Sequence, residues 1–156
     1  MTLAKFLRSL TRFRRLQPLV GRVHAAVLRR SRGRLRRSLL LAGGQPVLAL
    51  TTVGRRSGAR RTTAVAYVRD GESYAVGALN LGSDRDPAWC LNLRANPRGW
   101  IDVNGERRAI EAREAGGAEA ERLWRAFLER LPTIANSLRL ARREVPMLVL
   151  SPVPGD

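Results

Sequence analysis

Two runs of aliphatic and β-branched residues, 47–53 and 62–68, lie on either side of a short segment that is bounded by glycines. Residues of this kind favour extended strands. Gly54 and Gly58 permit a tight chain reversal between the two runs. The sequence therefore predicts a β-loop-β unit, which commits this part of the chain to an antiparallel sheet.

The segment between the two runs, residues 54–61, is called the arginine turn because it contains four arginines. Arginine presents a planar fork of donors that suits phosphate or carboxylate. Ser57 and the free N–H groups of a glycine-rich turn add further donors. The pattern favours an anion site, and a solvated, charged hairpin tip is the alternative. A Walker loop is excluded, because the segment lacks the Gly-Lys-Ser/Thr ending and no helix pattern follows it.

The positive charge of the chain is confined to its first part. The net charge is +16, yet residues 1–69 contain 17 basic residues and no acidic one, whereas residues 70–156 contain 12 arginines and 13 acids. Positive charge concentrated at one end of a chain is typical of an arm that meets an anionic surface. Nucleic acid is the less favoured partner, because the aromatic residues used for base stacking are missing from this arm.

The N-terminal arm has apolar residues at helical spacing in 3–16, with basic residues beside them, and a second helical pattern in 19–28 after Pro18. We expect a division into a basic amphipathic arm, residues 1–44, and a coenzyme-binding domain, residues 45–156. The arm packs against the domain or a second subunit in one interpretation and lies on anionic lipid in the other. No run of about 18 apolar residues is present to span a bilayer. The expected location is therefore cytoplasmic, with peripheral attachment to the inner face of the cell membrane as the second interpretation.

Residues 65–156 alternate between strand and helix patterns, with turn signals at Asp70-Gly71 and Asn104-Gly105. The predicted strands are 65–69, 74–79, 101–103, 107–113 and 145–150. The predicted helices are 88–95, 119–131 and 134–142. Mainly antiparallel hairpins with interposed helices predict an α+β, mainly β fold that closes into a small barrel.

Side chains that usually carry catalysis are scarce. The chain has one cysteine, Cys90, and one histidine, His24, which allows no internal disulfide and no zinc site made from such residues. Ser57 has no histidine partner, and Cys90 lies in an apolar helix pattern that is typical of an inert, packed thiol. We expect no metal and no side-chain nucleophile.

Four blocks of the sequence, in order, resemble the deazaflavin-dependent nitroreductase family of actinobacteria. They are Leu50-Thr51-Thr52-x-Gly54-Arg55-Arg56-Ser57-Gly58, Tyr67-x-Arg69-Asp70-Gly71, Gly82-Ser83-x-x-x-Pro87-x-Trp89-x-Leu91-Asn92-Leu93-x-Ala95-Asn96-Pro97 and Val145-Pro146-x-Leu148-Val149-Leu150. The resemblance covers residues 47–152, some two-thirds of the chain. It implies a split β-barrel, shared with FMN-binding oxidases, that binds coenzyme F(420), an 8-hydroxy-5-deazaflavin, in preference to FMN.

The resemblance also implies which residues meet the coenzyme. Those for the phosphate and the glutamyl tail are Arg55, Arg56, Ser57 and Arg61. Those along the ring system and around the closing helix are Thr62, Thr63, Ala64, Val65, Ala66, Gly77, Ala78, Leu79, Asn80, Ala88, Trp89, Cys90, Leu91 and Asn92.

In such a family the coenzyme carries the hydride, so the protein orients the ring and excludes water. The resemblance implies that family tyrosines around the substrate are replaced here by Ala66, Leu131, Ile134 and Ser137, and that Leu79 stands where a serine is usual. These five residues are the expected substrate pocket. An apolar pocket favours a hydrophobic acceptor, quinone-like or nitroaromatic. The alternative is a non-catalytic protein that binds the deazaflavin coenzyme or another hydrophobic ligand, and a flavin- or haem-binding relative is a third hypothesis. A homodimer is expected from the fold family.

Overall fold

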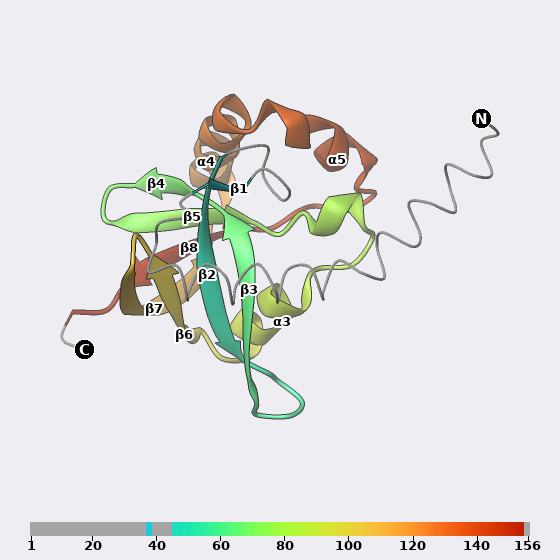
Figure 1. Ribbon diagram of the computed structural model, residues 1–156. Coiled ribbons are helices and arrows are strands. Elements are labelled where there is room, and N and C mark those ends of the chain that lie inside the picture. Colours follow the sequence, from blue (N-terminus) through green and yellow to red (C-terminus); the bar gives the residue numbers. More distant parts are fainter. Residues whose placement is uncertain (1–36, 39–44, 155–156) are drawn as a thin grey trace.

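The fold was determined from a computed structural model that describes residues 37–38 and 45–154 (Figure 1). The strands are β1 Arg37–Ser38, β2 Gln45–Val53, β3 Arg60–Ala66, β4 Val68–Asp70, β5 Ser73–Gly77, β6 Arg98–Val103, β7 Glu106–Glu114 and β8 Met147–Pro152. The α-helices are α3 Ala88–Ala95, α4 Gly117–Arg130 and α5 Ala135–Leu140, and the 3-10 helices are η1 Asn80–Gly82 and η2 Pro132–Ile134. The helices predicted in 3–16 and 19–28 lie outside the described residues.

All strand pairs are antiparallel, and the strand order is β1-β2-β6-β7-β8-β5-β4, with β3 also paired to β2. Strands β3 and β4 therefore lie at opposite ends of this order. Only Tyr67 separates them in the sequence. The sheet must curl to bring its two ends together, which produces the barrel seen in Figure 1.

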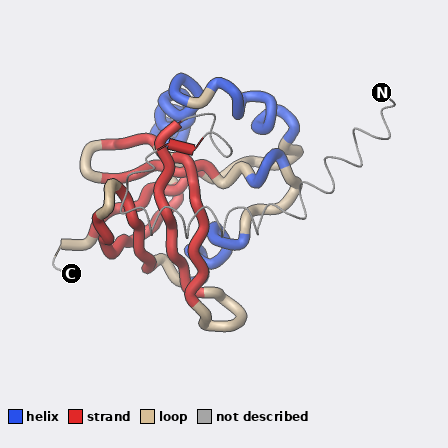
Figure 2. Tube along the Cα trace, in the orientation of Figure 1, coloured by secondary structure: helices blue, strands red, loops and turns tan. Residues whose placement is uncertain are grey.

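Two apolar clusters hold the barrel together. The first contains inward-facing strand residues such as Leu48, Leu50 and Ile101, together with Cys90 and Leu93 from α3. The second lies between the sheet and α4. Its main members are Val47, Val68, Ala75, Met147 and Val149 from the strands, and Leu123, Phe127 and Leu131 from the α4 region. Figure 2 shows α4 and α5 together on one side of the barrel and α3 apart from them.

The predicted secondary structure is confirmed where the signal is local. The helix predicted at 88–95 is α3, and the turns at Asp70-Gly71 and Asn104-Gly105 join β4 to β5 and β6 to β7. Gly71, Asn104 and Gly105 have positive φ, as these turns require. No helix in the described part of the chain is long and apolar enough to cross a membrane.

Several elements differ from the prediction. The run predicted as a strand at 62–68 is interrupted at Tyr67, between β3 and β4. The helix predicted at 134–142 ends at Leu140, and the strand predicted at 145–150 is β8 at Met147–Pro152.

Strand β5 ends at Gly77 rather than at residue 79. The N–H of Ala78 still donates to Pro146 O at 2.9 Å, but Pro146 has no N–H to return a bond and continue the ladder. Residues 80–82, where no helix was predicted, form η1. Strand β1, residues 37–38, pairs with β2 although no strand was predicted there.

Helix α4 approaches β5 closely at Gly77. A Cβ atom placed on Gly77 would lie 2.7 Å from Trp124 Cη2. The Trp124 ring is itself packed edge-on against Phe127, with ring centroids 5.6 Å apart. A side chain at position 77 would therefore push α4 away from the sheet.

We predict that Gly77→Ala lowers the free energy of unfolding by about 1–3 kcal/mol, the usual cost of overpacking a core. The measurement is urea unfolding followed by circular dichroism. Gly116→Ser is the matched control, because a Cβ there meets nothing within 4 Å, φ is −128°, and serine is favoured at this N-cap position. Equal stabilities of the two variants would contradict the close packing of Trp124 on Gly77.

Candidate functional site

The arginine turn is a compact loop between β2 and β3. Its backbone closes through Gly54 N–H to Ala59 O and Gly58 N–H to Gly54 O, both 2.8 Å, and Gly58 has φ +67°. Among the described residues, the N–H groups of Arg56 and Ser57 have no hydrogen-bond acceptor. Such free donors in a tight turn are suited to an anion.

Asn92 of α3 holds this turn in place. Its Oδ1 accepts from the N–H of Arg55 at 3.1 Å, and its Nδ2 donates to Thr52 Oγ1 at 3.0 Å. The residue is 3% exposed, so these bonds are shielded from water. The resemblance assigned Asn92 to the pocket wall. The structure instead uses both ends of its amide to join α3 to β2 and the turn.

The register of β2 and β3 sorts two neighbouring arginines onto opposite faces of the sheet. Arg61 pairs with Thr52 and Arg60 with Val53, and adjacent strand residues point to opposite faces. Arg60 stacks over the Trp100 ring, 4.3 Å from its centroid. Arg61 therefore lies on the face of Asn92 and α3, whereas Arg60 lies on the other face.

Ser57 and Arg61 converge above Gly54. A Cβ atom placed on Gly54 would lie 2.9 Å from Ser57 Oγ and 3.6 Å from Arg61 Nε. Position 54 is therefore too crowded for a side chain, because Ala59 O would also lie 3.1 Å away; glycine lets the Ser57 hydroxyl and the Arg61 guanidinium approach each other here. This arrangement fits a phosphate or carboxylate group.

The charge on the turn is not neutralised within the described part of the chain. Arg55, Arg56 and Arg61 are exposed, and no described carboxylate forms an ion pair with them. Acids elsewhere form ion pairs with other arginines. Arg122, for example, binds Asp70 at 2.8 and 2.9 Å and lowers the pKa of that carboxyl. The arginine turn therefore keeps its affinity for an external anion.

Strand β3 presents its residues alternately to two environments. Thr63 and Val65 pair with Leu50 and Leu48 and face the barrel interior, where Trp89 of α3 also packs. Ala64 and Ala66 pack instead on the cluster beneath α4. Within the described residues β3 pairs with β2 alone, so no described strand pairs with its other edge.

The ring segment, residues 77–80, follows β5 and is tightly held. Ala78 is 0% exposed, and its N–H and C=O both have protein partners. Asn80 has φ +45°, a left-handed conformation that is uncommon outside glycine, and its Nδ2 donates to Arg85 O at 2.9 Å. Gly77 is covered by Trp124 as described above. The segment therefore offers the edge of its backbone and the side chains of Leu79 and Asn80.

The α3 residues of the predicted site differ in exposure. Ala88 is exposed and Trp89 and Leu91 are partly buried, whereas Cys90 and Asn92 are buried. Burial raises the pKa of the Cys90 thiol to about 11, so the thiol is protonated at neutral pH. Trp89 is the α3 side chain that both packs on the interior core and retains an exposed surface.

Four of the five predicted substrate-pocket residues come together beneath α4. Ala66, Leu79 and Ile134 are partly buried against the cluster that contains Leu131. Leu131 is 1% exposed and is part of the core rather than an open wall. Ser137 lies on α5, where its carbonyl oxygen would be 2.7 Å from a Cβ on Gly82.

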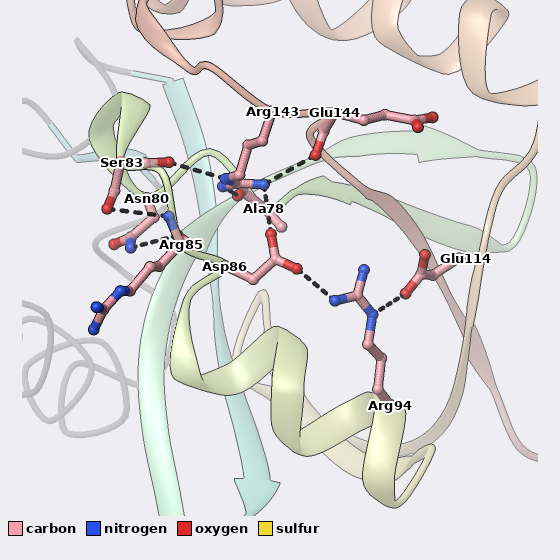
Figure 3. Close-up of polar contacts among 9 residues, drawn as sticks. All are labelled: Ala78, Asn80, Ser83, Arg85, Asp86, Arg94, Glu114, Arg143 and Glu144. Carbon is pink, nitrogen blue, oxygen red and sulfur yellow. Dashed lines mark hydrogen bonds and ion pairs between the residues drawn. The ribbon is translucent and has the colours of Figure 1, made fainter.

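Sequence reasoning missed Trp124 and an ion network next to the ring segment (Figure 3). Arg143, Asp86, Arg94 and Glu114 form a continuous chain of ion pairs across four separate parts of the fold. The hydrogen bonds that Arg94 donates to Glu114 and Asp86 raise the pKa of its guanidinium. The partners are up to 57 residues apart, so no local spacing could have indicated them.

We predict that Asn92→Leu, which keeps the side-chain volume but removes the amide, lowers the free energy of unfolding by about 1–3 kcal/mol, because the Arg55 N–H and the Thr52 hydroxyl lose a shielded partner. Chemical denaturation measures this. The exposed Asn136→Leu is the control and should change stability by about 0.5 kcal/mol or less. A cost for Asn92→Leu no larger than that of the control would show that the amide does not hold the turn.

The comparisons with known proteins agree with one another. The profile of the family described as F(420)H(2)-dependent quinone reductase matches residues 20–152. The F(420)H(2)-dependent quinone reductase of Mycobacterium tuberculosis is 32% identical over 133 residues, 83% of this chain and 88% of the relative. A solved structure of an F(420)-H(2)-dependent reductase, FDR-A, superposes with a TM-score of 0.63 at 28% identity, over 68% of this chain and 94% of the other. A second structure, described as a domain-swapped dimer, gives the same TM-score and identity over 68% of this chain and 80% of the other.

Proposed function

This chain belongs to the F(420)H(2)-dependent quinone reductase family, and from that premise we propose that its arginine turn, β3, ring segment and α3 together bind coenzyme F(420). It is an oxidoreductase with a split β-barrel fold, as the sequence resemblance predicted. The observation that carries the proposed site is the approach of Ser57 Oγ and Arg61 Nε to each other beside Gly54.

In this proposal the arginine turn holds the phosphate and the acidic tail. Arg61 and Ser57 bind from the sheet side, the N–H groups of Arg56 and Ser57 donate hydrogen bonds, and Arg55 and Arg56 supply further positive charge. Asn92 keeps the turn closed so that these donors are already aligned before the coenzyme arrives. A site that is organised in advance loses less conformational freedom on binding.

When bound, the reduced coenzyme supplies a hydride from its deazaflavin ring. The chain's own contribution is to orient the ring and exclude water. The edge of β3 and the ring segment would hold the ring, and Trp89 would cover it from α3. The apolar side chains of Ala66, Leu79 and Ile134 form the acceptor side, which favours a hydrophobic quinone over a polar nitroaromatic compound.

We predict that changing both Arg56 and Arg61 to alanine weakens the binding of oxidised F(420) by about tenfold or more, because a hydrogen bond to a charged group contributes about 1.5–3 kcal/mol. The measurement is a fluorescence titration, with FMN titrated in parallel. Arg125→Ala is the control: it also removes an exposed positive charge, but from α4. Equal affinities of the double variant and the control would exclude the arginine turn as the tail site.

A turnover assay distinguishes a catalytic protein from one that only binds the coenzyme. The family activity requires that the protein oxidise F(420)H(2) when a hydrophobic quinone is present. The specific observation in favour of a binding-only protein is the absence of a phenolic donor among Ala66, Leu79, Leu131, Ile134 and Ser137. Tight coenzyme binding with no turnover across a panel of quinones would support that second function.

The predicted arm, residues 1–44, includes β1, which pairs with β2 of the domain at 45–156. The part of the arm before β1 is proposed as a peripheral attachment to anionic membrane. Residues 1–36 contain 11 basic residues and no acidic one. Each basic residue near an anionic surface contributes about 1 kcal/mol. Such attachment at the inner face of the cell membrane would bring the enzyme close to lipid-soluble quinones.

We predict that the whole protein sediments with vesicles that contain anionic lipid and that salt weakens this binding. A variant with three arm arginines changed to glutamine should lose most of it: Arg8, Arg12 and Arg15. A control variant of equal charge has three C-terminal arginines changed: Arg125, Arg130 and Arg139. Equal loss in both variants would mean that net charge, not the arm, is responsible.

A homodimer is also part of the proposal. Its support is the similar solved structure described as a domain-swapped dimer, together with the expectation from the fold family.

A further inference from the structure

Arg143 lies four residues before β8, yet most of its hydrogen bonds go to another part of the chain (Figure 3). Its Nη2 donates to Ala78 O at 2.7 Å and its Nε donates to Ser83 O at 2.9 Å. Nη1 donates to Asp86 Oδ1 and, at 3.2 Å, to Glu144 O. The guanidinium therefore spans the segment from residue 78 to residue 86.

Asp86 connects this guanidinium to α3. One carboxylate oxygen accepts from Arg143 and the other from Arg94, which also binds Glu114 of β7. The side chains of Arg143 and Asp86 are each 14% exposed. An ion pair so shielded from water depends on both partners, because either charge alone would be buried without compensation.

The segment that Arg143 spans also has hydrogen bonds of its own and contains a strained residue. Gly82 and Ser83 close η1 through N–H bonds to Leu79 O and Asn80 O. Asn80 remains in a left-handed conformation, which is disfavoured for a residue with a Cβ and persists only where neighbours enforce it. The bonds to Ala78 O and Ser83 O fix the backbone on both sides of Asn80.

We propose that Arg143, held by Asp86, is the positioning residue for the ring segment, so that it controls affinity for the deazaflavin ring and not for the phosphate tail. This inference rests on the proposed function. Arg143 acts through the backbone of residues 77–80 and does not itself touch the coenzyme. Its bonds join the ring segment to the C-terminal strand and, through Asp86, to α3.

Helix α3 is attached at two points that serve the two parts of the coenzyme. Asn92 binds the arginine turn, and Arg94 binds Asp86 and thereby Arg143. The ring segment and the turn are thus fixed by different hydrogen bonds. A change in one network should alter recognition of one part of the ligand and leave recognition of the other part intact.

The test compares F(420) with 8-hydroxy-5-deazariboflavin, which has the same ring and lacks the phosphate and the glutamyl tail. Arg143→Gln should weaken the binding of both ligands by the same factor, about tenfold, since two backbone carbonyls lose a charged donor. Arg61→Ala should weaken the binding of F(420) and leave the tail-less ligand unchanged. Fluorescence titration gives all the dissociation constants.

Arg143→Lys separates positioning from stability. A lysine keeps the charge next to Asp86, but one ammonium group cannot reproduce the planar fork that reaches both carbonyls. The melting temperature of Arg143→Lys should lie closer to that of the wild type than the melting temperature of Arg143→Gln does. Its affinity for the tail-less ligand should stay as low as that of Arg143→Gln. Recovery of stability and affinity together would overturn the positioning role.

Different results would overturn the proposed coenzyme site and the positioning role of Arg143. Absence of F(420) binding by the wild-type protein would overturn both. Normal binding by the wild type, with Arg143→Gln and Arg143→Lys unchanged toward the tail-less ligand, would overturn the role of Arg143 alone.

Discussion

The buried amide of Asn92 is the interaction on which the site depends most. It binds the Arg55 N–H and Thr52 Oγ1, and so fixes the arginine turn to a helix whose buried residues belong to the barrel core. A shielded polar group must have its partners, because an unsatisfied donor or acceptor is costly. The same helix binds Asp86 through Arg94. One short helix therefore sets where the turn and the ring segment lie.

The charged side chains of the barrel include two contrasting groups, those in ion pairs and the arginines of the turn. Seven described acids of the second half of the chain form ion pairs with arginines. Glu119, for example, binds Arg113 at 2.7 Å through both oxygens, which lowers the pKa of Glu119. The turn residues Arg55, Arg56 and Arg61 have no such partner in the described residues. An acidic coenzyme tail is attracted to this unneutralised charge, and the attraction weakens as salt rises.

Local signals predicted much of the fold and non-local contacts could not be predicted. Asn104-Gly105 fixes a hairpin through the φ values of two residues, and the helix at 88–95 is bounded by proline on both sides, so each could be read from adjacent residues. The arginine turn was predicted for the same reason. Strand β1, the packing of Trp124 on Gly77 and the bonds of Arg143 depend on segments that meet only in the folded chain. The role of Asn92 was likewise set by a partner 37 residues away.

The account's central claim is that the coenzyme lies between the arginine turn and the ring segment, along the edge of β3 that is not paired with β2. Amide NMR of the protein titrated with oxidised F(420) tests this most directly, because the shift changes locate the ligand residue by residue. The account predicts the largest changes at the N–H groups of Arg56 and Ser57 and in residues 78–80. Changes confined to the opposite face, around Arg60 and Trp100, would contradict it.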